Sequence, residues 1–230
     1  MKILVINTGS SSIKYVLFEM TNHQVLAKGL VDRIGEANSS LTNSTFIPEV
    51  NKTRLETSIP NHSEGLELVV KTLTDPQTGI IKDTNEIMAV GHRVVHGGER
   101  FSEPVEINKD VKAKIKELIA LAPLHNPSNL EGINVAEKFF PNAKQIAVFD
   151  TAFHQSMPAK SFRYPIPNRL YTEEKIRVYG MHGTSHSYVS MQLISELDKP
   201  AKETSVISIH LGNGCSMAAV KGGQCIDTSM

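Results

Sequence analysis

Short apolar runs separated by polar turns make up the beginning and the end of the chain. Runs of this length, bounded by Gly, Asn and Ser, predict β-strands, here over residues 2–7, 12–19, 24–32, 87–95, 145–149, 206–209 and 216–220. Apolar residues at helical spacing predict helices over residues 63–73, 108–121, 127–139 and 184–197. Residues 36–62 are rich in Asn, Ser and Thr and predict a loop with one short strand at 44–48. This mixed order of strands and helices predicts an α/β fold.

The turn between the first two expected strands is rich in hydrogen-bond donors. Residues 7–14 read NTGSSSIK. Gly9 lets the backbone approach a ligand closely, while the three serine hydroxyls and the Lys14 ammonium can donate to a phosphate. A Walker A loop is absent, since Lys14 lies on the outgoing strand rather than at a helix start. Two interpretations stay open, a phosphate cradle and an ordinary Ser-rich β-hairpin.

The end of the chain repeats the pattern of its beginning. The segments VINTGSSSIKYVLFE and SIHLGNGCSMAAVKG both run from an apolar strand through a glycine turn with small polar residues to a second apolar strand. Such a repeat indicates two related halves, each with a phosphate-sized turn. The alternative is that any β-hairpin shows this pattern. Residue 230 falls in the third strand of the repeat, so the chain is expected to be cut.

Composition excludes several classes of partner. The 24 basic and 24 acidic residues balance, which argues against nucleic acid or an acidic membrane surface as the main partner. The first apolar run has the four residues 3–6, too short for a signal peptide, and no segment is long and apolar enough to predict a membrane span. Cys215 and Cys225 lack metal-type spacing, so a reduced, cytoplasmic setting is expected.

Three polar side chains lie at positions typical of functional sites, namely inside an apolar strand, at the end of a strand and just before a helix. Arg93 lies in an apolar strand, so its guanidinium needs an anion, either a bound carboxylate or phosphate or an internal acid. Asp150 follows a strand and is placed either to serve Mg²⁺ or to cap a turn. His182 precedes Thr184, the expected cap of the following helix, and is either a donor to a phosphoryl group or a structural histidine.

The combination of these groups favours one kind of chemistry. Two phosphate-type turns, a carboxylate, an arginine in a strand and a histidine in a loop predict phosphoryl transfer with magnesium, a reaction in which the protein mainly positions groups and neutralises charge. His182 and His186 are four residues apart, but no HExxH motif or third ligand accompanies them, so zinc is not expected.

Five segments of the chain form a specific combination over residues 1–230. They are NTGSSSIKY, GHRVVHGGERF, FDTAFH, YGMHGTSHSYV and HLGNGCSMAAVKGG, in this order. The combination resembles the acetate kinase (acetokinase) family. The resemblance implies a duplicated ribonuclease-H-like fold of the superfamily of actin, sugar kinases and heat-shock ATPases. It also implies a homodimer that reversibly transfers the γ-phosphoryl group of ATP to acetate, giving acetyl phosphate and ADP, with Mg²⁺ or Mn²⁺.

The resemblance also implies roles for individual residues. Asn7 corresponds to the family's magnesium-side asparagine, and the nearby phosphate-side groups are Ser10, Ser12 and Lys14. Arg93 corresponds to the arginine that binds the substrate carboxylate, Asp150 to the catalytic aspartate, and His182 to the histidine that stabilises the transferring phosphoryl group. The implied apolar pocket for the acyl methyl group consists of Val95, Leu124 and Met181. The implied nucleotide-phosphate loop consists of His210, Leu211, Gly212, Asn213 and Gly214.

The implied domains are unequal. Residues 1–150 correspond to a first ribonuclease-H-like domain without the family's returning C-terminal helix, and residues 151–230 to the opening part of a second, nucleotide-binding domain. The family's second catalytic arginine, adenine pocket and late magnesium-side glutamate lie beyond the position of residue 230. The chain is therefore expected to be an N-terminal fragment that is inactive by itself and exposes apolar surface.

Two other functions stay open. Position 181 often carries an aromatic residue in this family, whereas this chain has Met181. Because methionine adapts to irregular gaps, a preference for propionate or butyrate is an alternative to acetate. A non-catalytic nucleotide-binding domain with an actin-like fold is the second alternative, although the presence of Arg93, Asp150 and His182 together argues against it.

Overall fold

The chain divides into two compact units. The structure is a computed structural model that describes all residues from 1 to 230. The first unit consists of residues 1–94 and 105–147, and the second of residues 95–104 and 148–230. The expected domain boundary at residue 150 stays a prediction. No helix is both long and apolar enough to cross a membrane.

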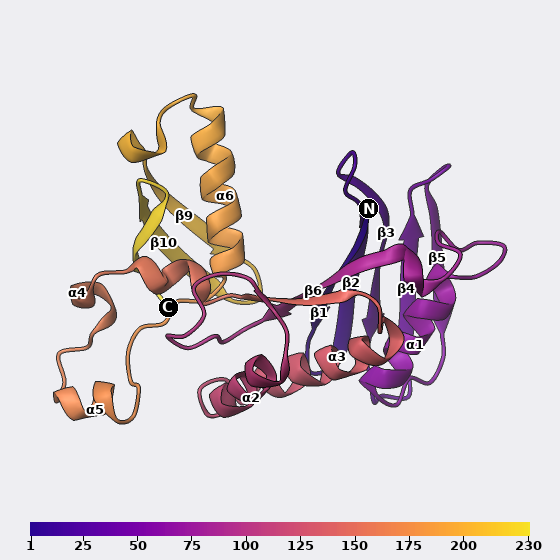
Figure 1. Ribbon diagram of the computed structural model, residues 1–230, viewed down its shortest axis with the longest axis horizontal. Helices are drawn as coiled ribbons and strands as arrows, with labels where there is room; N and C mark the ends of the chain where they lie inside the picture. Colours follow the sequence, from indigo (N-terminus) through magenta and orange to yellow (C-terminus); the bar gives the residue numbers. More distant parts are fainter. The chain divides into compact units, whose positions relative to one another are not determined.

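The first unit is built on one mixed sheet. Its strands are β1 (Lys2–Thr8), β2 (Ser12–Glu19), β3 (Gln24–Asp32), β4 (Ser40–Thr45), β5 (Asn51–Glu56), β6 (Ile87–Val94), β7 (Val105–Glu106) and β8 (Lys144–Phe149). They lie in the order β5-β4-β3-β2-β1-β6-β8-β7 (Figure 1). The first three strands form the expected antiparallel meander, whereas β1 and β6 are parallel. The α/β class predicted from the sequence is confirmed.

The polar segment before the first helix differs from the prediction. It contains two strands, β4 and β5, rather than one short strand at 44–48. Every residue of β5 is exposed, so its side chains carry no period-two signal. In β4 the buried Asn43 accepts a hydrogen bond from the Tyr15 hydroxyl at 2.6 Å. Pairing with the edge of β3, rather than local propensity, therefore decides the structure of this segment.

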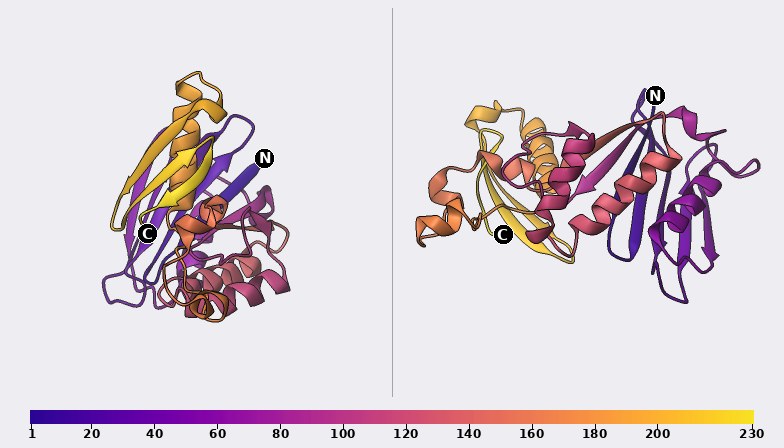
Figure 2. Two further views of the ribbon diagram at one scale, coloured as in Figure 1. Left: turned by 90° about the vertical axis from the view of Figure 1, so that its left-hand side faces the viewer. Right: turned by 60° about the horizontal axis from the view of Figure 1, so that its bottom comes forward.

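Helices cover one face of the first sheet. They are α1 (His62–Leu73) and α3 (Asn126–Phe139), whereas α2 (Lys109–Glu117) contacts α3. The unit also contains the short 3₁₀ helices η1 (Thr84–Glu86) and η2 (Leu118–Ala120). The Asn61 and Asn108 side chains cap α1 and α2 by accepting from backbone N–H groups of the first turn. α1 contacts β2, β3 and β4, α3 contacts β1 and β6, and the two helices contact each other (Figure 2). The apolar core of the unit lies between these helices and the sheet.

The second unit is a three-stranded sheet with one long helix. Its elements are η3 (Ala152–Ser156), α4 (Ala159–Phe162), α5 (Asn168–Thr172), α6 (Gly183–Glu196), η4 (Ala201–Glu203), β9 (Ser205–Leu211), β10 (Cys215–Lys221) and β11 (Gln224–Thr228). β9, β10 and β11 form an antiparallel meander like that of β1, β2 and β3, as the sequence repeat predicts. Gly222 and Gly223 form the hairpin turn between β10 and β11, and both have positive φ. α6 contacts β9, and η3 contacts β11.

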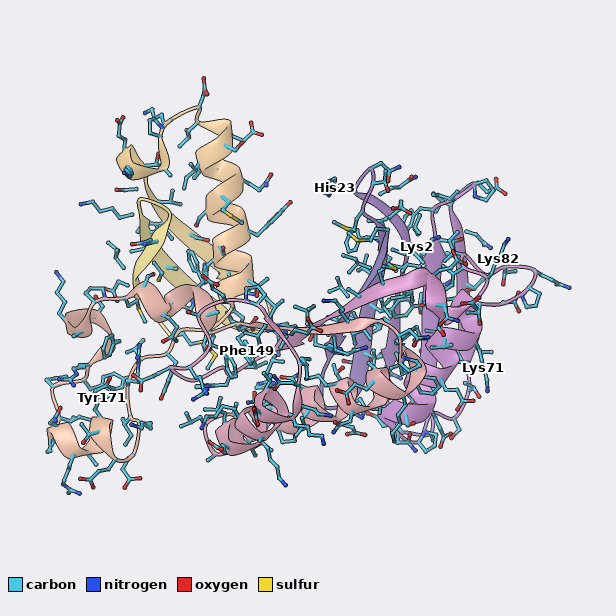
Figure 3. The ribbon with its side chains drawn as sticks, viewed as in Figure 1. Lys2, His23, Lys71, Lys82, Phe149 and Tyr171 are labelled. Atoms are coloured by element: carbon cyan, nitrogen blue, oxygen red, sulfur yellow. The ribbon has the colours of Figure 1, made fainter.

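An ion pair to Glu99 holds the irregular segment before α6 in place. The Arg177 side chain is almost fully buried and forms an ion pair with Glu99 at 2.6 Å. Its guanidinium lies over the Phe162 ring at 3.8 Å. The Tyr171 hydroxyl donates to the same carboxylate at 2.9 Å (Tyr171 is labelled in Figure 3). This network explains how residues with little regular structure reach a defined position.

The second unit leaves apolar side chains exposed. Ile207, Ile209 and Leu211 on alternate positions of β9 are 67%, 53% and 77% exposed. On α6 the apolar residues Tyr188 and Met191 are also exposed, whereas the buried positions are Gly183, His186 and Ser190. The sequence predicts exposed apolar surface, and this unit contains it. The helix thus turns small and polar side chains toward its own sheet.

Candidate functional site

The turn after β1 is held from behind by two helices. Gly9 N–H donates to the Ser12 carbonyl at 2.8 Å and closes the turn. Asn129 of α3 donates to the Thr8 carbonyl at 2.7 Å, and His62 of α1 donates from Nε2 to the Gly9 carbonyl at 2.8 Å. Because the Thr8 and Gly9 carbonyl oxygens accept hydrogen bonds from the helices, their partial negative charge does not face a ligand on the opposite side of the turn. The turn is therefore suited to an anion, as the first interpretation of the sequence requires.

A close approach of α3 fixes the end of β1. A Cβ atom at Gly132 would lie 2.2 Å from the Thr8 hydroxyl oxygen and 2.9 Å from the Thr8 Cβ. Only glycine therefore fits at this position of the helix. The contact lets Asn129, one turn earlier in α3, reach the Thr8 carbonyl.

Arg93 lies beside Asn7 in the first unit. β6 runs parallel to β1 with His92 opposite Ile6, so the following residues of the two strands are neighbours. The Arg93 Nη1 donates to the Asn7 side-chain oxygen at 3.4 Å. On the other side of β1, Asn7 is opposite Lys14 of β2. Two cationic side chains thus flank Asn7 at one end of the sheet, where a carboxylate or phosphate would be favoured.

Asp150 lies at the start of α6 in the second unit. It follows the last residue of β8, Phe149, which is labelled in Figure 3. Its carbonyl accepts from the Gly183 N–H at 2.9 Å, and its buried carboxylate accepts from the Thr184 hydroxyl at 3.4 Å. A Cβ at Gly183 would lie 2.1 Å from the Asp150 carbonyl oxygen. Glycine at the first position of α6 is therefore what allows the strand end and the helix start to meet.

His182 rather than Thr184 is the N-cap of α6, which corrects the prediction. Its backbone is left-handed, with φ 58° and ψ 25°, a conformation that costs free energy for a residue other than glycine. Its Nδ1 lies 2.8 Å from the Ser216 hydroxyl of β10. Its ring stacks on that of His210, with centroids 4.2 Å apart. The backbone conformation, the hydrogen bond and the stacking together fix the orientation of the imidazole.

The loop between β9 and β10 passes directly over the His182 ring. A Cβ at Gly214 would lie 3.0 Å from Cε1 and 3.1 Å from Nε2 of His182. The loop is closed by the Gly212 N–H, which donates to the Gly214 carbonyl at 2.9 Å. His210 Nδ1 lies 3.0 Å from the Ser185 hydroxyl of α6. The second unit therefore brings the predicted histidine and the predicted phosphate loop into contact.

The chain matches a protein-family model over almost its whole length. The family model described as "Acetokinase family" matches residues 2–230. This chain belongs to the acetokinase family. It is 56% identical over 230 residues to the acetate kinase of Flavobacterium johnsoniae, and the match covers 100% of this chain and 57% of that relative. It thus spans little more than half the length of the curated relatives it matches.

Solved structures of acetokinases have the same fold. The crystal structure of Porphyromonas gingivalis acetate kinase matches with a TM-score of 0.92 at 46% identity. A propionate kinase from Francisella tularensis matches with a TM-score of 0.89 at 44% identity. Each match covers 100% of this chain and 57% of the other. The fold that the resemblance implies is therefore confirmed for these 230 residues.

Two further histidines of the chain lie behind His182. His186 is fully buried, and burial is the main cause that lowers its pKa to about 4, with the neighbouring histidines adding to it. Burial also lowers the pKa of His154, whose Nε2 donates to the Met181 carbonyl at 3.0 Å. Both rings are therefore neutral near pH 7, and His154 fixes the backbone of the residue before His182.

The remaining predicted residues are distributed over both units of the chain. Ser10 and Lys14 are exposed in the first unit, where Ser12 is partly covered. Leu124 of the same unit is 77% exposed. The other two residues of the predicted apolar pocket, Val95 and Met181, belong to the second unit, where Val95 is buried and Met181 is half-buried. The composition of this pocket stays a prediction.

The donor set fits a metal that arrives with a nucleotide. No group of three or more His, Cys, Asp or Glu side chains is placed to hold a metal ion by itself. Mg²⁺ keeps several waters and is usually bound by one or two carboxylates together with substrate phosphates. The Asp150 carboxylate at a strand end suits this mode, and the Asn7 amide oxygen is a ligand of the right chemistry.

Sequence reasoning missed the residues that support the site. His62 and Asn129 hold the first turn, and Ser216, Ser208 and His186 lie behind His182. Among these residues, His186 is the one for which the sequence contains a signal, namely its four-residue spacing from His182. The serines have no such signal, because small hydroxyl residues in strands are common.

Proposed function

We propose that this chain forms part of an acetate kinase, an enzyme that reversibly transfers the γ-phosphoryl group of ATP to acetate, with Mg²⁺ or Mn²⁺. Family membership supports phosphoryl transfer, and the relatives named acetate kinase support the acceptor. The single observation that carries the proposal is the contact between His182 and the loop at Gly214. It joins a hydrogen-bond donor for a phosphoryl oxygen to a loop suited to nucleotide phosphates.

The reaction needs no proton to move. An oxygen of the acetate carboxylate attacks the γ-phosphorus, the new P–O bond forms, and the bond from that phosphorus to the β–γ bridging oxygen breaks, leaving ADP. In this proposal Arg93 binds the acceptor carboxylate with its planar fork. His182 donates a hydrogen bond to an oxygen of the transferring group, where negative charge is concentrated.

Other residues act on the nucleotide. The N–H groups of the loop His210–Gly214, together with Ser10, Ser12 and Lys14, are proposed to bind phosphate oxygens. Asp150 and Asn7 are proposed to hold the metal, which when bound neutralises charge on the phosphates. A homodimer in the cytoplasm is likewise part of the proposal for the whole enzyme.

Activity is proposed to require more polypeptide than these 230 residues. The relatives are longer, and the chain covers 57% of the acetate kinase of Flavobacterium johnsoniae. The test is a chimera in which residues 1–230 replace the matching part of that relative, hereafter the chimera. We expect the chimera to form acetyl phosphate, trapped as hydroxamate, and the 230-residue chain alone to form little or none. A chimera that binds ATP without forming acetyl phosphate would favour a non-catalytic nucleotide-binding domain.

Propionate is the second candidate acceptor. The match to a propionate kinase at 44% identity favours it, and the flexible Met181 in place of an aromatic residue would leave room for another methylene. One methylene in an apolar pocket changes kcat/KM by roughly 10- to 200-fold. Comparing kcat/KM of the chimera for acetate, propionate and butyrate therefore decides between the two, and acetate is expected to be preferred.

A further inference from the structure

Four side chains form an unbroken line of hydrogen bonds in the second unit. The Ser208 hydroxyl lies 3.0 Å from His186 Nδ1, His186 Nε2 lies 2.8 Å from the Ser216 hydroxyl, and the same hydroxyl lies 2.8 Å from His182 Nδ1. The strand register explains the line. Ser216 is opposite His210 on β10, and Ser208 is two residues before His210 on β9, so both serines point to the face that α6 covers.

The middle of this line is neutral. His186 is fully buried, and its pKa is lowered to about 4, mainly by burial. A neutral imidazole has one N–H and one lone pair, so it donates at one nitrogen and accepts at the other. Each serine hydroxyl likewise has one proton to donate. Ser216 is buried between the two rings, so its hydroxyl avoids an unsatisfied O–H by accepting from one ring and donating to the other. The direction of one hydrogen bond in the line therefore fixes the direction of the others.

The hydrogen bond at Ser208 determines the direction of the other hydrogen bonds in the line. The hydrogen-bond partner that the structure provides for the buried Ser208 hydroxyl is His186 Nδ1. Leaving a buried O–H without an acceptor costs free energy, so this hydroxyl donates to Nδ1. His186 then has its proton on Nε2 and donates to Ser216. The Ser216 hydroxyl in turn donates to His182 Nδ1.

We propose that Ser208 and His186, acting through Ser216, hold neutral His182 in the tautomer that has its proton on Nε2. The inference rests on the proposed function for its consequence in catalysis. Nε2 is the nitrogen beside the loop at Gly214. With a proton there, His182 donates to a phosphoryl oxygen, whereas a lone pair at the same place would repel it. Ser208, His186 and Ser216 are thus positioning residues, and no proton leaves His182.

Histidine tautomers can be read directly by NMR. The test uses the 230-residue chain labelled with ¹⁵N at its histidine rings, at a pH where His182 is neutral, with its signals assigned through His182→Asn. Two-bond ¹H–¹⁵N correlations distinguish the two tautomers. We expect both His182 and His186 to have the proton on Nε2. A proton on Nδ1 of either ring in the unaltered chain overturns the proposal, and this measurement needs no variant to fold.

A variant that reverses the line tests the coupling. Ser208→Asp places an acceptor beside His186 Nδ1, which should draw the His186 proton to Nδ1 and make Ser216 donate to His186 instead. His182 should then switch to the tautomer with its proton on Nδ1. In the double variant Ser208→Asp, Ser216→Ala, the tautomer switch should occur in His186 alone, because the hydroxyl that links the two rings is absent. Ser205→Asp, the same change at an exposed position of β9, is the matched control and should leave His182 unchanged. A switch in His186 without one in His182 contradicts the proposal.

Kinetics of the chimera test the consequence. Ser208→Asp is expected to lower kcat on the order of tenfold or more while KM for ATP and acetate stays within about twofold, since a positioned donor acts on the transition state. Ser205→Asp should keep kcat close to that of the unaltered chimera. An unchanged kcat in a chimera whose His182 has switched overturns the inference. A chimera without any phosphoryl transfer instead counts against the proposed function, and the NMR result still decides the tautomer.

Discussion

The imidazole rings of His182 and His210 stack with their centroids 4.2 Å apart and their planes inclined by only 17°. The two residues come from different elements, the N-cap of α6 and the end of β9. Each ring is also hydrogen-bonded through Nδ1 to a serine hydroxyl, His182 to Ser216 and His210 to Ser185. The stacking and the two hydrogen bonds therefore fix the orientation of both rings beside the loop that is proposed to bind nucleotide phosphates.

Replacing His182 should affect the rate far more than binding. In the chimera, His182→Asn is expected to lower kcat by roughly 100-fold or more, with a much smaller change in KM, because a donor to developing charge acts mainly in the transition state. Asparagine is chosen because it tolerates the left-handed backbone at this position. Steady-state kinetics with ATP and acetate measure both constants.

The control for this variant is His23→Asn. His23 has φ 56°, close to the 58° of His182, but it is exposed in the turn between β2 and β3. It should keep kcat unchanged, so that a loss seen only at position 182 reports the side chain and not the backbone. If His182→Asn left kcat as it was, His182 would have no part in the mechanism.

Arg93→Lys should weaken acceptor binding selectively. Lysine keeps the positive charge but loses the planar fork, and a hydrogen bond to a charged group is worth about 1.5–3 kcal/mol. KM for acetate in the chimera is therefore expected to rise by roughly 10- to 100-fold, while KM for ATP stays the same. Arg54→Lys, on the exposed strand β5, is the matched control. Equal KM values for acetate before and after the change would exclude Arg93 as the acceptor-binding group.

Gly132→Ala should destabilise the first unit. The new Cβ would lie 2.2 Å from the Thr8 hydroxyl oxygen, so α3 or the end of β1 must move, at a cost of about 1–3 kcal/mol. Gly65→Ala in α1 is the control, since its Cβ would meet the tip of Ile13 at 3.3 Å and alanine favours helix. Urea unfolding of the 230-residue chain measures both, and equal losses in the two variants would contradict the close approach.

Acid should destabilise the chain at a pH where most proteins are still stable. Burial lowers the pKa of His96 and of His186 from the usual 6.5 to about 4. Between these values the unfolded chain binds protons that the folded chain does not, so the free energy of unfolding falls as the pH falls from 6.5 toward 4. Each such histidine contributes at most about 1.4 kcal/mol per unit of its pKa shift.

Urea unfolding at pH 7 and pH 5 measures this slope. The chain should be less stable at pH 5, and His186→Gln should reduce the difference between the two pH values. His23→Asn, which removes an exposed histidine, should leave the difference unchanged. Equal stability of the unaltered chain at both pH values would show that the buried histidines are not kept neutral.

Local patterns predicted most of the elements. The strands around the first turn, the strand that ends before Asp150 and the helices near 63–73 and 127–139 have strong apolar periodicity, and the structure has them within a residue or two. α1 also begins at the Asn61 cap, and α3 has Pro127 in its first turn. In place of β4 and β5 the sequence predicts only one short strand at 44–48, because the residues of this segment are polar. Pairing of β4 with β3 and of β5 with β4 is the reason that both are strands. The start of α6 was misplaced because a left-handed histidine as N-cap has no sequence signal.

The sequence by itself determined the order of elements, the family and the set of polar groups available for chemistry, because short-range periodicity and motif order are properties of neighbouring residues. Only the tertiary structure decided which polar groups touch. Asn129 and His62 reach the first turn, and Ser216 and Ser208 reach the histidines of α6. Such contacts depend on strand register and on the rotation of a helix against its sheet, which are set by packing between residues far apart in the chain.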